Sequence, residues 1–300
     1  MDTIYTSCVA RTPEQHRDMT GAAKTKLYVF DAHETVGQTD ARNSKAGFAI
    51  RKLTFPRSMM ISKSSPDWVQ LSVRTSGEKF TSVTPNLGQH YESAVFFSPA
   101  DKNITVYSSP GHSYLSLGLH RDMISEPLRE RLNRALDSPD LAISHVSAHF
   151  RKTLVFGINQ LLERPMLEHD FNEQIEAYFS STLDEVERTL QIHISDNRAR
   201  IIAHAINLIV DNKGKKFTMR YLSEACHCSI RTLEYAFSSR LGLSPKEFLT
   251  YFRLNCYRER ILSNPSSTLS AQAYELEFKH LGNLAKNYRN LFGTLPSARC

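Results

Sequence analysis

The chain has 300 residues, 41% of them hydrophobic, which is enough for two domains with buried cores and excludes a disordered chain. Its N-terminus has no basic start followed by an apolar run, and no stretch of about 18 apolar residues occurs, so we expect a soluble, cytoplasmic protein. The cysteines are odd in number and unevenly spread, which argues against a disulfide framework and for reduced thiols: Cys8, Cys226, Cys228, Cys256 and Cys300.

The positive charge is concentrated at one end of the chain. Residues 196–300 hold 16 lysines and arginines against 8 acidic residues, whereas residues 1–195 hold 21 against 23. This split predicts two domains with these bounds, the second of which binds a polyanion. The basic third has no helix with a wholly apolar opposite face, so nucleic acid is favoured over a membrane surface.

Residues 20–120 show the pattern of β-strands. WVQLSVRT from residue 68 and HSYLSLGLH from residue 112 alternate apolar and polar residues, and turn clusters recur every ten to twenty residues. The pattern predicts an antiparallel sandwich or barrel with one face of each strand inward.

Residues 121–195 show helical spacing instead. In DFNEQIEAYFSSTLDEVERTLQ, residues 170–191, apolar residues recur every three or four positions and form a stripe about one helix face wide. The plain interpretation is a helix packed on its own domain; the alternative is an interface between two copies of the chain, and hence a homodimer. The polar segment at residues 193–200 marks the domain boundary.

The basic third contains a repeat. LEYAFSSRLGLSP aligns with LAKNYRNLFGTLP at an offset of 51 residues, and the segments before them align at an offset of 50. In the first copy Thr218 caps one helix, Ser229 caps a second, and Gly242 ends it. We therefore predict helix-turn-helix units at about 218–240 and 268–291, each presenting the outer face of its second helix to DNA.

A longer helix joins the two units. Ser244 is its cap, Pro245 occupies its first turn, and Glu247 completes a capping box. The helix extends to about Leu262, or roughly 25 Å. This spacing places the two second helices about one DNA turn, 34 Å, apart, so that one chain reads two successive major grooves.

The last hundred residues resemble the DNA-binding domain of AraC/XylS-type bacterial transcription regulators. RTLEYAF, GLSPKEF and HLGNLAKNYRNLFGTLPS are most similar to the branch that includes regulators of alkylbenzoate breakdown and ethanolamine use. The resemblance implies double-stranded promoter DNA and RNA polymerase as partners, and activation of transcription. It also implies DNA contacts through outward residues of both second helices, which here are Ile230, Arg231, Glu234, Tyr235 and Ser238, then His280, Gly282, Asn283, Lys286 and Asn287.

The second unit departs from the family pattern. Gln272 stands where a buried aliphatic residue is usual, Glu277 where a turn glycine is usual, and Asn283 where the branch often has arginine. We therefore expect this unit to be less stable or less specific, and we expect Arg231 and Tyr235 to carry most of the base reading.

The first two thirds resemble the family's cupin-like sensor domain in architecture alone, which completes an α+β fold with an N-terminal β-barrel and helices. The resemblance implies a small-molecule effector and dimerisation, but identifies no ligand residue. The alternative regulation is by a protein partner. One group of aromatic residues would either line a pocket or form the core: Trp68, Phe96, Phe97, Tyr107 and Tyr114.

Motifs for enzymatic chemistry are incomplete. GHSYL has Leu115 where a nucleophile elbow ends in glycine, and HVSAH, with His145 and His149, lacks the glutamate of a zinc-protease helix. His90 and Glu92 in GQHYE have no second histidine nearby. We expect no catalytic activity and no cofactor, so an enzyme fused to a DNA-binding module is the remote alternative.

Cys226, His227 and Cys228 suggest a metal site at first sight. No second pair of ligands follows at zinc-site spacing, and the repeat places the two cysteines at the positions of Leu276 and Phe278. We therefore predict that both thiols support the turn, that His227 takes a left-handed backbone conformation, and that no metal binds.

Overall fold

The computed structural model describes most of the chain, and among the described residues no helix is long and apolar enough to cross a membrane. The described residues are 3–20, 25–31, 37–45, 47–63, 67–76, 80–82, 94–98, 103–137, 143–189, 197–213 and 217–298.

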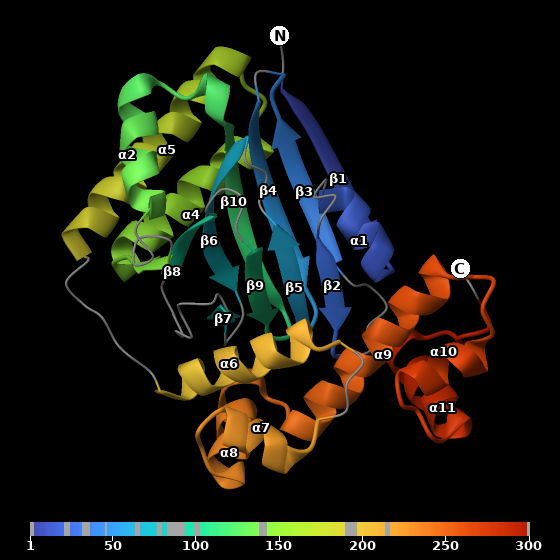
Figure 1. Cartoon of the computed structure of the whole chain (residues 1–300). Helices are drawn as coiled ribbons and strands as arrows, with labels where there is room; N and C mark the ends of the chain where they lie inside the picture. Colours follow the sequence, from blue (N-terminus) through green and yellow to red (C-terminus); the bar gives the residue numbers. More distant parts are fainter. Residues whose placement is uncertain are drawn as a thin grey trace.

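The N-terminal domain contains two antiparallel sheets (Figure 1). The large sheet has the order β1-β3-β4-β10-β6-β8-β11, with strands at Ile4–Ala10, Gly37–Asn43, Phe48–Phe55, His112–His120, Trp68–Ser76, Ala94–Ser98 and Ile143–His145. The small sheet has the order β2-β5-β9-β7, with strands at Lys26–Val29, Ser58–Lys63, Asn103–Ser108 and Phe80–Ser82. The predicted antiparallel β-structure is confirmed, but it starts with β1 rather than near residue 20, a helix α1 (Pro13–Thr20) precedes β2, and no closed barrel forms among the described strands.

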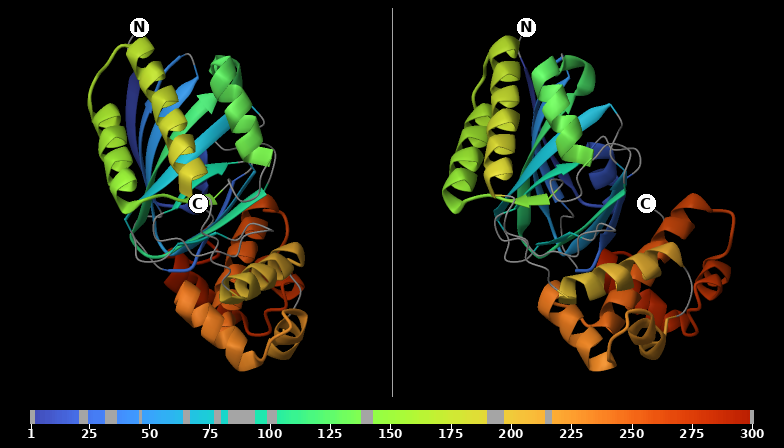
Figure 2. Two further views of the ribbon diagram at one scale, coloured as in Figure 1. Left: turned by 90° about the vertical axis from the view of Figure 1, so that its left-hand side faces the viewer. Right: turned by 60° about the vertical axis from the view of Figure 1, so that its left-hand side comes forward.

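Helices cover the outer face of the large sheet, as the two views in Figure 2 show. They are α2 (Glu126–Asp137), α4 (Ala148–Glu163) and α5 (Glu168–Thr189), after a short 3₁₀ turn at Arg121–Met123. The alternating apolar residues of β6 and β10 are all buried against these helices. The apolar stripe of α5 joins the same core, and its residues are fully covered: Phe171, Ile175, Phe179, Leu183 and Val186. The stripe therefore packs on its own domain and is not available to a second copy of the chain.

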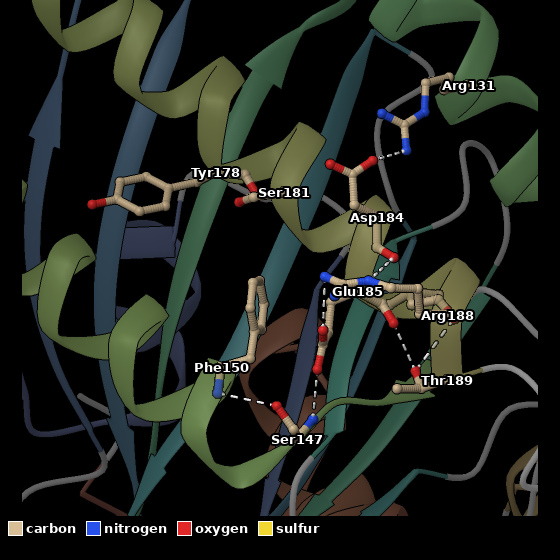
Figure 3. A network of polar contacts seen from close by, with 10 residues as sticks. Arg131, Ser147, Phe150, Tyr178, Ser181, Asp184, Glu185, Arg188 and Thr189 are labelled. Atoms are coloured by element: carbon tan, nitrogen blue, oxygen red, sulfur yellow. Dashed lines mark hydrogen bonds and ion pairs between the residues drawn. The ribbon is translucent and has the colours of Figure 1, made fainter.

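Polar contacts hold the helical layer together (Figure 3). The Ser147 amide donates to Glu185 Oε1 of α5 at 3.1 Å, and the Ser147 hydroxyl accepts from the Phe150 amide at the start of α4. Arg131 of α2 pairs with Asp184 of α5 at 2.7 Å. The hydrogen bond from Ser147 lowers the pKa of Glu185, so this carboxylate is charged at neutral pH.

The expected aromatic group does not line one pocket. Phe97 faces α5, whereas Tyr107 points toward the C-terminal domain and Tyr114 lies between the two sheets. Trp68 stands edge-on to a histidine at the end of β10. The Phe96 side chain lies outside the described part of the chain. Strand alternation sends neighbouring residues to opposite faces, which is why the group is dispersed.

The C-terminal domain is all helical, as predicted. Its helices are α6 (Asn197–Asp211), α7 (Met219–Ala225), α8 (Ile230–Leu241), α9 (Pro245–Ser263), α10 (Leu269–Glu275) and α11 (Leu281–Phe292). The fold is therefore α+β, with the strands confined to the N-terminal domain among the residues described.

One hydrophobic cluster joins the two domains. Tyr28 of β2 packs on Phe252 of α9 with ring centroids 5.1 Å apart, and Phe30 packs on Phe248 at 4.9 Å. Figure 1 shows α6 and α9 running below the end of the small sheet. The division at residue 195 remains a prediction, and the buried core crosses it.

Candidate nucleic-acid interface

The first helix-turn-helix unit has the predicted caps. Thr218 Oγ1 accepts from the Tyr221 amide at 3.1 Å, and Ser229 Oγ accepts from the Thr232 amide at 3.0 Å. Gly242 ends α8 in the left-handed region with φ 65°. These bonds satisfy amides that have no partner within a helix, and they fix where α7 and α8 begin.

The turns of the two units are alike in detail. His227 has φ 51° and Glu277 has φ 60°, and these are the non-glycine residues with positive φ in the described chain. In the first unit the Cys228 amide donates to the Ser223 carbonyl at 3.0 Å; at the equivalent place in the second, the Phe278 amide donates across its turn at 3.0 Å. The predicted left-handed conformation of His227 is confirmed.

The two thiols of the first turn are structural. Cys226 is buried, with its Sγ 3.8 Å from the Ile201 carbonyl oxygen. Burial raises the pKa of Cys226 to about 11 and also raises that of Cys228, so both thiols are protonated at neutral pH. No group of three or more potential metal ligands is found in the described part of the chain.

Two of the other motifs lack the local structure that their chemistry would need. His145 ends β11 and His149 lies in α4, so the two are not one helical turn apart. Ser113 lies within β10 rather than at a strand-to-helix turn. His90 and Glu92 lie outside the described residues.

The long connecting helix starts with the predicted capping box. The Ser244 amide donates to Glu247 Oε2 at 2.8 Å, and the Glu247 amide donates back to Ser244 Oγ at 3.3 Å. Helix α9 has 19 residues and ends at Ser263, one residue beyond the predicted end.

All ten predicted DNA-contacting residues are exposed. We call the α8 set the first reading face, comprising Ile230, Arg231, Glu234, Tyr235 and Ser238. The second reading face, at α11, comprises His280, Gly282, Asn283, Lys286 and Asn287. The inward residues Leu233, Phe237 and Leu284 are buried, as the repeat predicts. The role of each exposed residue in DNA binding stays a prediction.

Helix α6 adds a cation beside the first reading face. The guanidinium carbon of Arg198 lies 5.0 Å from the centroid of the Tyr235 ring, within cation–π range. Nothing in the sequence points to this neighbour, because the two residues belong to different helices and no motif links them.

The unusual residues of the second unit are accommodated locally. Gln272 is buried, and its Nε2 donates to the Asn264 and Ser267 carbonyls at 2.9 and 3.2 Å. Arg253 of α9 donates to the Leu276 carbonyl at the turn. These bonds supply part of the stability that we expected the second unit to lack, whereas Gln272 Oε1 is buried without a hydrogen-bond partner among the described residues.

Comparison with known proteins agrees with this geometry. Residues 222–299 match a family described as a helix-turn-helix domain. The chain is 34% identical over 95 residues to the XylDLEGF operon transcriptional activator 3 of Pseudomonas putida. The aligned segment covers 31% of this chain and 28% of that protein. The C-terminal domain is of the AraC/XylS type. The chain thus matches less than a third of that relative's length.

Two further likenesses reach beyond the AraC/XylS-type domain. The "Probable thc operon regulatory protein" of Rhodococcus erythropolis is 23% identical over 240 residues, covering 75% of this chain and 71% of that protein. The crystal structure of the AraC-like transcriptional activator CuxR covers 92% of this chain and all of its own, with 15% identity and a TM-score of 0.43, which does not establish a shared fold. These relatives are transcription regulators, not enzymes.

Proposed function

We propose that the protein is a transcription activator that reads two successive major grooves of promoter DNA. The observation that carries the proposal is the pair of helix-turn-helix units with matching turns, joined by α9, each with an exposed second helix. The 19 residues of α9 span about 28 Å, close to one DNA turn once the width of the units is added.

Base reading is assigned chiefly to the first reading face. The exposed guanidinium of Arg231 is of the type that can donate two hydrogen bonds to guanine, and Tyr235 lies beside Arg198. The remaining lysines and arginines of the domain contact phosphates and position the helices. In this arrangement affinity falls steeply with salt, because phosphate contacts release counterions.

Arg231→Ala tests this assignment. We expect a loss of about 1 to 3 kcal/mol on the selected operator, confined to one base position, and little change on random DNA. The measurement is fluorescence anisotropy on duplexes obtained by in vitro selection with the full chain. Arg17→Ala, at an exposed position of α1, is the control and leaves both affinities unchanged. An equal loss on specific and random DNA would make Arg231 a phosphate contact.

Activation requires a contact with RNA polymerase, and dimerisation would present two such domains to paired half-sites. The names of the Pseudomonas putida relatives support activation. In vitro transcription from a selected promoter with purified polymerase tests it: a rise in transcript supports activation, and a fall indicates repression. Sedimentation at micromolar concentration tests the homodimer.

The N-terminal domain, we further propose, binds a small anionic effector at Arg51. This residue lies on the inner face of β4 with Leu53, directly opposite Ser116 of β10, whose hydroxyl accepts from Ser72 at 3.2 Å. Arg51 is mostly buried, which lowers its pKa, and no carboxylate pairs with it among the described residues. A buried unpaired cation is costly, and an anionic ligand would offset that cost.

A thermal-shift comparison separates an effector from a protein partner. Benzoate and octanoate are expected to raise the melting temperature of the full chain, whereas benzamide and octanamide are not, and Arg51→Gln removes the effect. If neither acid raises the melting temperature, the effector proposal fails and regulation by a docked protein partner is favoured.

A further inference from the structure

The N-terminal domain contacts the end of the first reading helix. The Tyr107 hydroxyl of β9 donates to the Leu241 carbonyl, the last residue of α8, at 2.7 Å. Carbonyls in the last turn of a helix have no partner within the helix, so this bond satisfies an otherwise open acceptor. Tyr107 is 1% exposed and packs beside Phe30. The end of α8 is therefore fixed to a strand of the small sheet.

A second contact from the N-terminal domain reaches the other reading helix through one arginine. Glu14 of α1 accepts two hydrogen bonds from Arg258 of α9, at 3.1 and 3.0 Å. Arg258 also donates to the Tyr288 hydroxyl of α11 at 3.2 Å. Burial raises the pKa of Glu14, but the bond and charge of Arg258 more than offset this, so the pKa is lowered and the pair is ionic at neutral pH.

Between these contacts, α9 is anchored to the edge of the small sheet. Asn255 Nδ2 donates to the Val29 carbonyl at 2.7 Å, and the Val29 amide donates to Asn255 Oδ1 at 2.9 Å. The side-chain amide thus continues the hydrogen bonding of β2 in place of a further strand. With α9 held there, the Tyr107 and Glu14 contacts act on opposite ends of the DNA-binding domain.

We propose that Tyr107 and Glu14 are positioning residues that set the angles of the two reading helices separately. Tyr107 acts on the part of the single-chain binding site that α8 reads. Glu14, through Arg258, acts on the part that α11 reads. The proposal rests on the proposed DNA-reading function. It assigns to the N-terminal domain a direct effect on sequence preference, in addition to any effect on dimerisation.

In vitro selection from random duplexes with full-length variants tests the proposal. Arg231→Ala and Lys286→Ala first identify which half of the wild-type motif belongs to each reading face. Tyr107→Phe is then expected to lower preference at the α8 half about two- to tenfold, the range that one hydrogen bond supports, and Glu14→Gln at the α11 half. Tyr5→Phe and Glu130→Gln are matched controls in the same domain and leave the motif unchanged.

A double-variant cycle gives a second measurement that does not depend on the size of either effect. Glu14→Gln and Tyr288→Phe lie on one path and are expected to be non-additive in operator affinity, whereas Glu14→Gln and Tyr107→Phe are expected to add. Far-ultraviolet circular dichroism verifies that each variant is folded. Equal changes in both halves, or none in either, would overturn the positioning role. If the wild-type chain selects no motif at all, the proposed DNA-reading function itself is contradicted.

Discussion

His16 is an acid-sensitive residue of the N-terminal core. Its ring is fully covered, 4.8 Å from the Phe55 ring, and neither nitrogen has a hydrogen-bond partner among the described residues. Burial lowers the pKa of His16 to about 4. In the unfolded chain this histidine is protonated at a higher pH than in the folded protein. The stability that neutral His16 contributes is therefore complete above about pH 6.5 and is lost as the pH falls toward 4.

Replacing His16 isolates this effect. Between pH 7 and pH 4, the free energy of unfolding of the wild type is expected to fall by about 3 kcal/mol more than that of His16→Leu. Urea unfolding at the two pH values measures the difference. His149→Leu, at an exposed position of α4, should follow the wild type. Identical pH profiles for all three proteins would show that His16 is not the sensitive group.

Arg42 is buried and Arg51 is half-buried, and we expect their replacement to have opposite effects on stability. Arg42 donates to the Leu162 carbonyl and the Thr3 hydroxyl, so Arg42→Met leaves these acceptors open and destabilises the fold. Arg51→Met removes a cation without an acidic partner, and we expect it to stabilise the effector-free protein by about 1 to 2 kcal/mol. Melting temperatures test both changes, and a drop for Arg51→Met would identify a structural arginine.

At the scale of elements, each turn between paired helices contains one strained residue. Non-glycine residues in the left-handed region cost about 1 kcal/mol. His227→Gly and Glu277→Gly are therefore each expected to stabilise the protein by about that amount in chemical unfolding. Glu173→Gly, at an exposed position in the second turn of α5, should lower stability by a similar amount. Destabilisation by both turn variants would show that their side chains make contacts that outweigh the strain.

The helices of the two helix-turn-helix units and the helix that joins them were predictable, whereas α1 and the sheet order were not. Caps at Thr218, Ser229 and Ser244 and the glycine after α8 act locally, so their effect can be deduced from neighbouring residues. The repeat then placed the second unit. Pairing of β4 with β10, or of β5 with β9, joins segments that are far apart, and the alternation of apolar residues marks a buried face without specifying its partner. Exposure of both reading faces followed from the repeat, whereas the contact between Tyr235 and Arg198 and the bond from Tyr107 to the end of α8 did not.

At the scale of the molecule, the shared core predicts cooperative unfolding. Asn255→Ala leaves the buried amide and carbonyl of Val29 unpaired, at a cost of about 1 to 3 kcal/mol. Trp68 is the only tryptophan and reports on the N-terminal domain, while circular dichroism at 222 nm is dominated by helices. We expect both signals to shift together in Asn255→Ala.

The matched control for this variant is Asn159→Ala, whose amide bonds only within α4 among the described contacts. It should shift both signals much less. Two separate transitions in Asn255→Ala, with the helical signal lost first, would contradict a single cooperative unit.

The bond between Val29 and Asn255 also has a consequence for synthesis of the chain. The two residues are 226 positions apart, so at ordinary translation rates on the order of ten to forty seconds separate their emergence from the ribosome. During that interval Tyr28 and Phe30 lack the helix that covers them in the finished protein. The small sheet thus completes its burial only when the last third of the chain has been made, and a truncated product would carry an apolar surface open to chaperones and proteases.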